Sequence, residues 1–245
     1  MGILNARKLT IDRLQKEILL LQGFRTAAQR SKYAVSLASI EHAFPNSVFP
    51  TGAIHEFINP MPESAAASGG FIAGILNSLM GNEKSCLWIS ASRTLFPPSL
   101  KLFGVAPDRI IFIDLKRERD VLWAMEESLK CEGLAAVIGE VPEINLTQSR
   151  RLQLTVEKSG VTGFILRDNI QKLSTSACSA RWQVTPILSE LEEGMPGVGF
   201  PRWKVELLKV KNGNPGSWDV EWSAGRFNLI KNEELVLEKT KVLYG

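Results

Sequence analysis

Residues 52–80 read GAIHEFINPMPESAAASGGFIAGILNSLM, and this stretch decides the fold. Its beginning, GAIHEFI (52–58), is a short apolar run that predicts a buried strand. Its end, FIAGILNSLM (71–80), places apolar residues at helical spacing and predicts a helix. The segment between them, residues 59–70, holds two prolines and two glycines and is predicted to be a loop. A strand, a loop and a helix in this order are the first unit of an α/β sheet.

The same alternation continues along the chain. Strands are predicted at 85–91, 109–115, 134–141 and 161–168, and helices at 97–103, 119–133 and 147–159. Three later strands, at 180–190, 201–211 and 217–225, follow one another without helices, and NGNPG (212–216) predicts a hairpin between the last two. The fold class is therefore α/β, with a mostly parallel central sheet flanked by helices and antiparallel strands at the C-terminal end.

Composition excludes several classes of protein. The 245 residues are 44% hydrophobic and 22% charged, which excludes a mainly disordered chain, a coiled coil and a collagen. The net charge of +3 permits contact with nucleic acid but does not indicate a dedicated binder. The sequence contains no apolar stretch of about 20 residues, so no membrane span is predicted. The three cysteines are far apart and no histidine lies near them, so we expect no disulfide framework and no metal site, and a reducing cytoplasm as the location.

The N-terminal segment carries an amphipathic pattern. Ile11, Leu14, Ile18 and Leu21 are spaced by three, four and three residues within 9–22, which predicts one apolar stripe along a helix. The stripe has two interpretations. It packs against its own domain, or it is a surface that binds a partner protein.

In a sheet of this class ligands bind at the carboxyl ends of the strands, so the segment 59–70 is where a phosphate-binding loop is expected. Here MPESAAAS (61–68) resembles the phosphate loop of the RecA recombinase core through Pro62, Glu63 and Ser64. CLWISASRTLFPPSLKLFGV (86–105) follows the pattern of the same family. The resemblance covers about residues 48 to 225 and implies three parts: an N-terminal helical segment (1–47), a RecA-like core (48–228) and a C-terminal tail (229–245).

The chain departs from the RecA pattern in the phosphate loop. In this register Ala67 replaces the phosphate-binding lysine, and Met61 and Ala66 replace the two loop glycines. Ser68 alone keeps its hydroxyl. The lost lysine removes a charge-assisted bond worth about 1.5–3 kcal/mol. Without the glycines, Cβ atoms keep the backbone amides away from a phosphate.

The acidic positions depart as well. Ser92 stands where the resemblance places the catalytic glutamate, and Gly139 where it places the magnesium-binding aspartate. We therefore expect a pseudo-ATPase with no catalytic residue and no cofactor. Two alternatives remain open at this point: Gly69 and Gly70 form a shifted phosphate loop, or Glu140 still holds a metal ion.

The remaining candidate residues concern partners and DNA. Trp218 and Trp222 share one face of a late strand and form either a partner-binding surface or part of the core, as tryptophans on strands more often do. His55 lies within a strand and is expected to be a packed core residue.

The RecA resemblance places the DNA-binding loops at about residues 142–148 and 169–175. Arg150, Arg151 and Lys172 are the nearby cations, and the alternative is a solvated helix face. Neither loop holds an aromatic residue on which a base could stack, so weak or indirect DNA contact is expected.

Among RecA relatives without a working nucleotide site, the chain resembles the ImuA family. The resemblance is carried by FPTGAIHEF (49–57), ACSARW (177–182) and the stretch PRWKVELLKVKNGNPGSWDVEW (201–222), together with the N-terminal helix. It implies an accessory role in the SOS response to DNA damage, in error-prone translesion synthesis and mutagenesis. It also implies an ImuB-like adaptor, an error-prone DNA polymerase and RecA as partners.

Two other functions remain open. The first is a SulA-like inhibitor of cell division, which would bind the tubulin-like division protein. The second is a residual DNA-dependent ATPase that would use Ser68 or Glu140.

Overall fold

The computed structural model describes residues 13, 14, 17, 35–92, 95–168, 174–190 and 199–230. These residues form one sheet in the strand order β3-β2-β4-β5-β1-β6-β7-β8-β9. The strands are β1 (Ile54–Asn59), β2 (Ser85–Ser90), β3 (Ile110–Asp114), β4 (Leu134–Glu140), β5 (Thr162–Asp168), β6 (Ala180–Ile187), β7 (Arg202–Val210), β8 (Gly216–Ser223) and β9 (Arg226–Leu229). Neighbours from β3 to β6 are parallel, and those from β6 to β9 are antiparallel, which confirms the predicted fold class.

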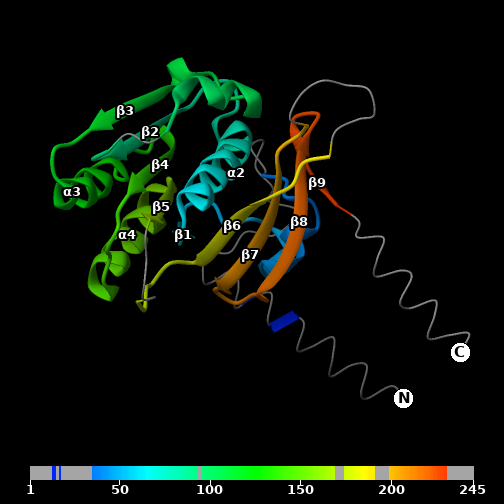
Figure 1. Cartoon of the computed structure of the whole chain (residues 1–245). Coiled ribbons are helices and arrows are strands. Elements are labelled where there is room, and N and C mark those ends of the chain that lie inside the picture. The colour runs from blue at the N-terminus through cyan, green and yellow to red at the C-terminus, as the bar shows by residue number, and fades with distance from the viewer. Residues whose placement is uncertain are drawn as a thin grey trace, which may run out of the picture.

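Helices cover both faces of the parallel part of the sheet (Figure 1). The α-helices are α2 (Pro62–Met80), α3 (Glu118–Ser128) and α4 (Leu146–Ser159). The 3-10 helices are η2 (Ala38–Ala43), η3 (Pro45–Ser47), η4 (Pro97–Phe103) and η5 (Pro107–Arg109). Two hydrophobic clusters result: α2 and the antiparallel strands enclose one, and α3 and α4 enclose the other on the opposite face.

The start of α2 corrects the sequence prediction. Residues 62–70 are helical, so the predicted loop shrinks to a turn between β1 and Pro62. Proline suits the first helical position because its missing N–H would have no partner there, and the alanines that follow favour a helix. The alternative of a shifted phosphate loop at Gly69 and Gly70 is wrong, since both glycines lie inside α2.

The glycines of α2 allow the helix to approach the aromatic side chains of the antiparallel strands. A Cβ on Gly74 would lie 2.5 Å from Phe227 Cζ and 2.8 Å from Trp222 Cζ3. A Cβ on Gly70 would lie 3.1 Å from Trp203 Cζ2 of β7, and 2.9 Å from Phe103 Cζ of η4. Close packing therefore explains why glycines that ordinarily weaken a helix occur in its interior.

Other element ends also differ from the prediction: α3 ends at Ser128, whereas the predicted helix ran to residue 133. Helix α4 begins at Leu146, one residue before the predicted start at 147, and Asn145 is its N-cap. The Asn145 side chain accepts from the backbone N–H of Gln148, and the Gln148 side chain accepts from the backbone N–H of Asn145, which forms a capping box. Strand β9 was not predicted. It follows a tight turn in which Ala224 and Gly225 both have positive φ, 52° and 70°.

The segment before β1 packs into the same core as the sheet. Leu37, Ile40, Phe44 and Phe49 are all buried in the cluster that contains α2. Part of the predicted N-terminal segment, from Val35 to Ser47, is therefore in contact with the core, and the domain boundary at residue 47 stays a prediction.

Candidate functional site

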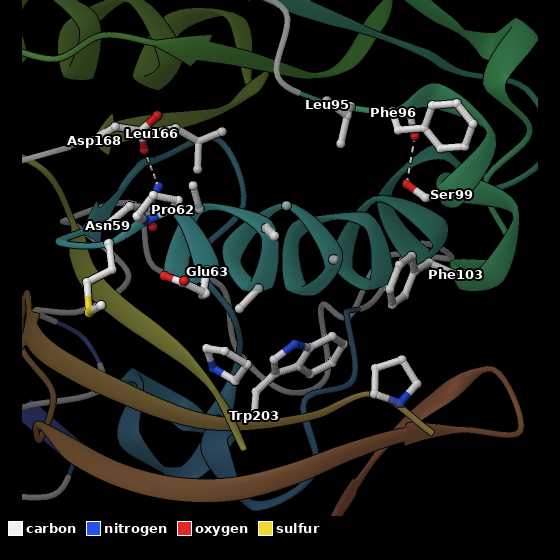
Figure 2. Close-up of a pocket in the computed structure, with 18 of the residues that line it drawn as sticks. Asn59, Pro62, Glu63, Leu95, Phe96, Ser99, Phe103, Leu166, Asp168 and Trp203 are labelled. Atoms are coloured by element: carbon white, nitrogen blue, oxygen red, sulfur yellow. Dashed lines mark hydrogen bonds between the residues drawn. The ribbon is translucent and has the colours of Figure 1, made fainter. Parts of the chain in front are cut away.

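A cavity of about 820 Å³ lies at the carboxyl ends of the parallel strands, along the N-terminal half of α2 (Figure 2). Its floor is the small-residue face of the helix, including Ala65, Ala66 and Gly69. The segment 95–103 forms one wall. The ends of β6 and β7 form the other wall, with Trp203 facing the helix.

Hydrogen bonds close the turn that joins β1 to α2. The Ser68 hydroxyl donates to Asn59 Oδ1 at 2.6 Å, and Asn59 Nδ2 donates to Asp168 Oδ1 at 2.7 Å. Ser68 is fully buried, so the one hydroxyl kept from the RecA pattern is committed to Asn59. A metal ion at this position would have to displace that bond.

The first turn of α2 offers little to an anion. Proline at residue 62 has no N–H, and the backbone N–H groups of Ser64 and Ala65 both donate to the carbonyl of Met61. The first turn also carries the exposed carboxylate of Glu63. A carboxylate satisfies the helix dipole here and repels a phosphate.

The predicted acidic positions lie beside a buried glutamate. Glu140, at the end of β4, accepts a hydrogen bond from Trp88 Nε1 at 2.9 Å and another from Ser92 Oγ at 3.5 Å. Burial raises the pKa of the Glu140 carboxyl, and the nearby Asp168 raises it further. An aspartate could not replace Gly139 without rearrangement, because a Cβ there would lie 2.7 Å from Met125 Sδ.

The charged residues that line the cavity are mostly acidic. Glu63, Glu140 and Asp168 line it, whereas Arg202 is the sole cation among its described lining residues. The Arg202 guanidinium is paired with the carboxylates of Glu190 and Glu221. The residues present therefore do not fit a magnesium nucleoside triphosphate.

A second polar cluster, on the α4 side of β1, was not predicted. Glu56 is fully buried and pairs with Arg167 at 2.6 Å and Arg181 at 2.7 Å, while Ser176 Oγ donates to the same carboxylate at 2.8 Å. Burial would raise the pKa of Glu56, but the bonds from Arg167, Arg181 and Ser176 hold it below its ordinary value. The signal in the sequence was a charged residue inside each of three apolar strands, namely Glu56, Arg167 and Arg181.

His55 is a core residue, as predicted. Its Nε2–H donates to the Pro50 carbonyl at 2.7 Å, and its Nδ1 accepts from Trp182 Nε1 at 3.2 Å. The Phe49 ring stacks on the imidazole with centroids 4.5 Å apart. Burial lowers the pKa of His55 to about 4, so the ring is neutral at physiological pH.

Of the four residues of the predicted N-terminal stripe, the structure describes only Leu14, so their grouping on one face stays a prediction. Leu14 is 49% exposed, and Ile11, Ile18 and Leu21 lie outside the described residues.

The late tryptophans turn inward. Trp222 is buried and donates from Nε1 to the Leu102 carbonyl at 3.1 Å, and Trp218 packs partly buried against the same core. Of the two interpretations offered for these residues, the structure therefore agrees with core packing, because the pleat of β8 directs both toward α2 and the core.

Two of the three candidate DNA-contacting residues lie on α4. Arg150 is exposed, Arg151 pairs with Glu126 at 2.5 Å, and Lys172 lies outside the described residues. These positions leave the prediction of weak DNA contact untested.

Metal-ligand and membrane signals were searched over the same part of the chain. Within residues 35–92, 95–168, 174–190 and 199–230, with 13, 14 and 17, no three His, Cys, Asp or Glu side chains gather as metal ligands would. No helix in those described segments combines the length and apolar character needed to cross a bilayer. All three cysteines are free thiols, Cys86 and Cys178 buried and Cys131 exposed.

The fold is that of the RecA-like recombinases. A solved structure of the RadB recombinase superposes on 75% of this chain and 93% of its own with a TM-score of 0.52 and 11% sequence identity. Within this class the chain is 31% identical over 192 residues to Protein ImuA of two Caulobacter vibrioides strains, which covers 74% of this chain and 79% of theirs. The chain belongs to the ImuA family.

A more distant relative is the cell division inhibitor SulA of Photorhabdus laumondii. It is 29% identical over 110 residues, 44% of this chain and 62% of that protein. No family model matches the chain.

Proposed function

We propose that this chain is a non-catalytic, RecA-like accessory protein of error-prone translesion DNA synthesis in the response to DNA damage. Membership of the ImuA family supports the biological role. The observation that carries the non-catalytic part is the helix that begins at Pro62, where the RecA pattern has its phosphate loop. The protein then acts in the cytoplasm through protein partners: an ImuB-like adaptor, an error-prone polymerase and RecA.

Three independent features at one edge of the sheet support the proposal of a pseudo-ATPase. The Ser68 hydroxyl is bonded to Asn59, the first turn of α2 carries Glu63, and the place of the magnesium ligand is filled by Gly139 under Met125. Each feature alone would weaken nucleotide binding. Together they remove the anion site, the metal ligand and the space for one.

The test is complementation of damage-induced mutagenesis. A strain that lacks the gene should show a low mutation frequency after ultraviolet irradiation, restored by the wild-type chain. Glu140→Gln keeps an acceptor for Trp88 and should restore it equally, because no metal or water activation at this position is needed. Purified protein should show no DNA-stimulated ATP turnover.

Two results together would support the ATPase alternative instead: a folded Glu140→Gln protein that fails to restore mutagenesis, and ATP turnover by the wild-type protein that Glu140→Gln abolishes. Wild-type complementation that fails altogether would refute the mutagenesis role.

Partner capture tests the N-terminal stripe. Leu14→Glu with Ile18→Glu should reduce recovery of the adaptor or polymerase from DNA-damaged cells, while the melting temperature stays within a few degrees of wild type. Arg13→Glu with Glu17→Arg is the matched control, since it reverses an exposed pair and leaves the apolar stripe intact. Unchanged capture by the Leu14 and Ile18 variant would refute the assignment.

The similarity to SulA favours a second candidate, an inhibitor that binds the tubulin-like division protein. Overproduction of the chain would then produce filamentous cells, and the purified chain would reduce the GTP turnover of the division protein. Normal cell length on overproduction would rule this candidate out.

A further inference from the structure

The cavity along α2 differs at its two ends. Asp168, Asn59 and Glu63 lie at one end, where the parallel strands finish (Figure 2). Phe96 and Phe103 lie toward the other end, and Trp203 faces the helix from the opposite wall. The lining is therefore acidic at one end and aromatic at the other.

Large apolar side chains are exposed around this cavity. Phe96 is 67% exposed and Met61 is 59% exposed, and both line it. Side chains of this size gathered at the mouth of one cavity mark a surface that binds another molecule.

The charges determine what that molecule is. Glu63 is exposed, Asp168 is half-buried, and the only described lining cation, Arg202, is already paired with two carboxylates. An acidic rim with a paired cation attracts a positive group and repels a phosphate or an acidic peptide.

The floor sets a further requirement. Ala65, Ala66 and Gly69 present no side chain beyond Cβ, so a bound segment can approach the helix backbone closely. A cavity with a floor of small residues, an acidic end and an aromatic end matches a peptide that carries a Lys or Arg a few residues from a large apolar side chain.

We propose that this cavity, which lies where RecA-like proteins hold nucleotide, binds an apolar and cationic peptide segment of a partner protein. The basic side chain lies beside Glu63 and Asp168. The apolar side chain packs against the exposed Phe96, at the end of the cavity where Phe103 and Trp203 stack on each other. This inference rests on the proposed accessory function, because it replaces the nucleotide with a protein ligand at the same edge of the sheet.

The experiment uses the full chain labelled with 5-fluorotryptophan and observed by fluorine NMR. Trp88 and Trp203 line the cavity, whereas Trp123 is exposed on α3, on the opposite face of the sheet. The probe is the tetrapeptide acetyl-Arg-Leu-Phe-Arg-amide. It should shift the Trp88 and Trp203 resonances in a saturable manner and leave that of Trp123 unchanged.

Further measurements vary the charge of the peptide, the charge of the cavity and the space inside the cavity one at a time. Acetyl-Glu-Leu-Phe-Glu-amide keeps the apolar residues and should bind at least tenfold more weakly. Glu63→Lys should weaken the cationic probe roughly threefold to tenfold, and its binding should weaken as salt is raised. Ala66→Trp should abolish binding by filling the cavity, since Ala66 lines it and is exposed. Glu118→Lys, an equal charge change at the exposed start of α3, is the control and should have no effect.

The outcomes separate this inference from the proposed function. Saturable shifts that depend on Glu63 support the peptide site. Equal binding of both tetrapeptides, or binding that Ala66→Trp leaves unchanged, would overturn it. No binding of the cationic probe would also overturn it and leave the accessory function standing. If magnesium ATP shifts Trp88 and Trp203 instead, both the peptide site and the non-catalytic function fail.

Discussion

His55 links the stability of the protein to pH. Its pKa is about 4 in the folded chain because the ring is buried, and about 6.5 when the chain is unfolded. Between these values the unfolded chain binds a proton that the folded chain does not. The contribution of the neutral His55 ring to the free energy of unfolding is therefore fully present above about pH 6.5 and is lost as the pH falls toward 4.

We expect wild-type protein to lose about 3 kcal/mol of unfolding free energy through this one group between pH 7 and pH 4. Urea unfolding at several pH values measures it, with His55→Gln as the comparison. That variant should be less stable at pH 7, and its deficit should narrow as the pH falls. A deficit that is constant from pH 7 to pH 4 would contradict the assignment.

The carboxylate of Glu56 balances the positive charges of two buried guanidinium groups. Arg167 and Arg181 both donate to its carboxylate, and all three side chains are buried or nearly so. Glu56→Leu should destabilise the fold by roughly 3–5 kcal/mol, because both arginines would keep their charge without a partner. Chemical denaturation measures the loss.

The exposed pair of Arg151 with Glu126 is the matched control for Glu56. Glu126→Gln should cost less than about 1 kcal/mol, since water solvates the arginine when its partner is removed. Similar costs for the two glutamates would mean that burial does not govern the Glu56 cluster.

At the scale of elements, α2 contains two glycines with opposite expected behaviour. Gly74→Ala should destabilise the protein by about 1–3 kcal/mol, since its Cβ would overlap Phe227 and Trp222. Gly69→Ala should stabilise it by roughly 0.5–1 kcal/mol, because the nearest side-chain atom, Leu95 Cδ1, would be 3.7 Å away and alanine favours a helix. Melting temperatures of the two variants check this pair. Changes of the same sign would show that helix propensity, and not packing, dominates at both sites.

Strand positions were predictable because each strand is a short apolar run between turn residues. The predictions at 85–91, 134–141 and 161–168 agree with β2, β4 and β5 to within a residue at each end. The start of α2 was not predictable in the same way. Pro60, Pro62, Gly69 and Gly70 are ordinary loop signals, and only contacts with the distant rings of Phe103 and Trp203 explain why Gly70 belongs to a helix.

At the scale of the whole molecule, binding to single-stranded DNA is expected to be weak. The net charge is only +3, Arg151 is paired, and the cavity is lined by carboxylates. Fluorescence anisotropy with a labelled oligothymidine should give a dissociation constant of about 10⁻⁴–10⁻⁶ M at physiological salt. Arg150→Glu should weaken it further. Nanomolar binding that Arg150→Glu leaves unchanged would contradict this expectation and indicate another surface.

The amino-acid sequence by itself determined the fold class, the RecA-like resemblance and the ImuA family, and the comparisons confirm all three. These follow from local patterns, namely apolar runs, helical spacing and motif order. The tertiary structure alone decided the rest. Glu56 meets Arg167 and Arg181 across 111 and 125 residues, and Asp168 meets Asn59 across 109. No local periodicity encodes such pairs, because strand order and register bring them together. For the same reason, only the fold turned Trp222 into the core and gathered carboxylates and aromatic rings around one cavity.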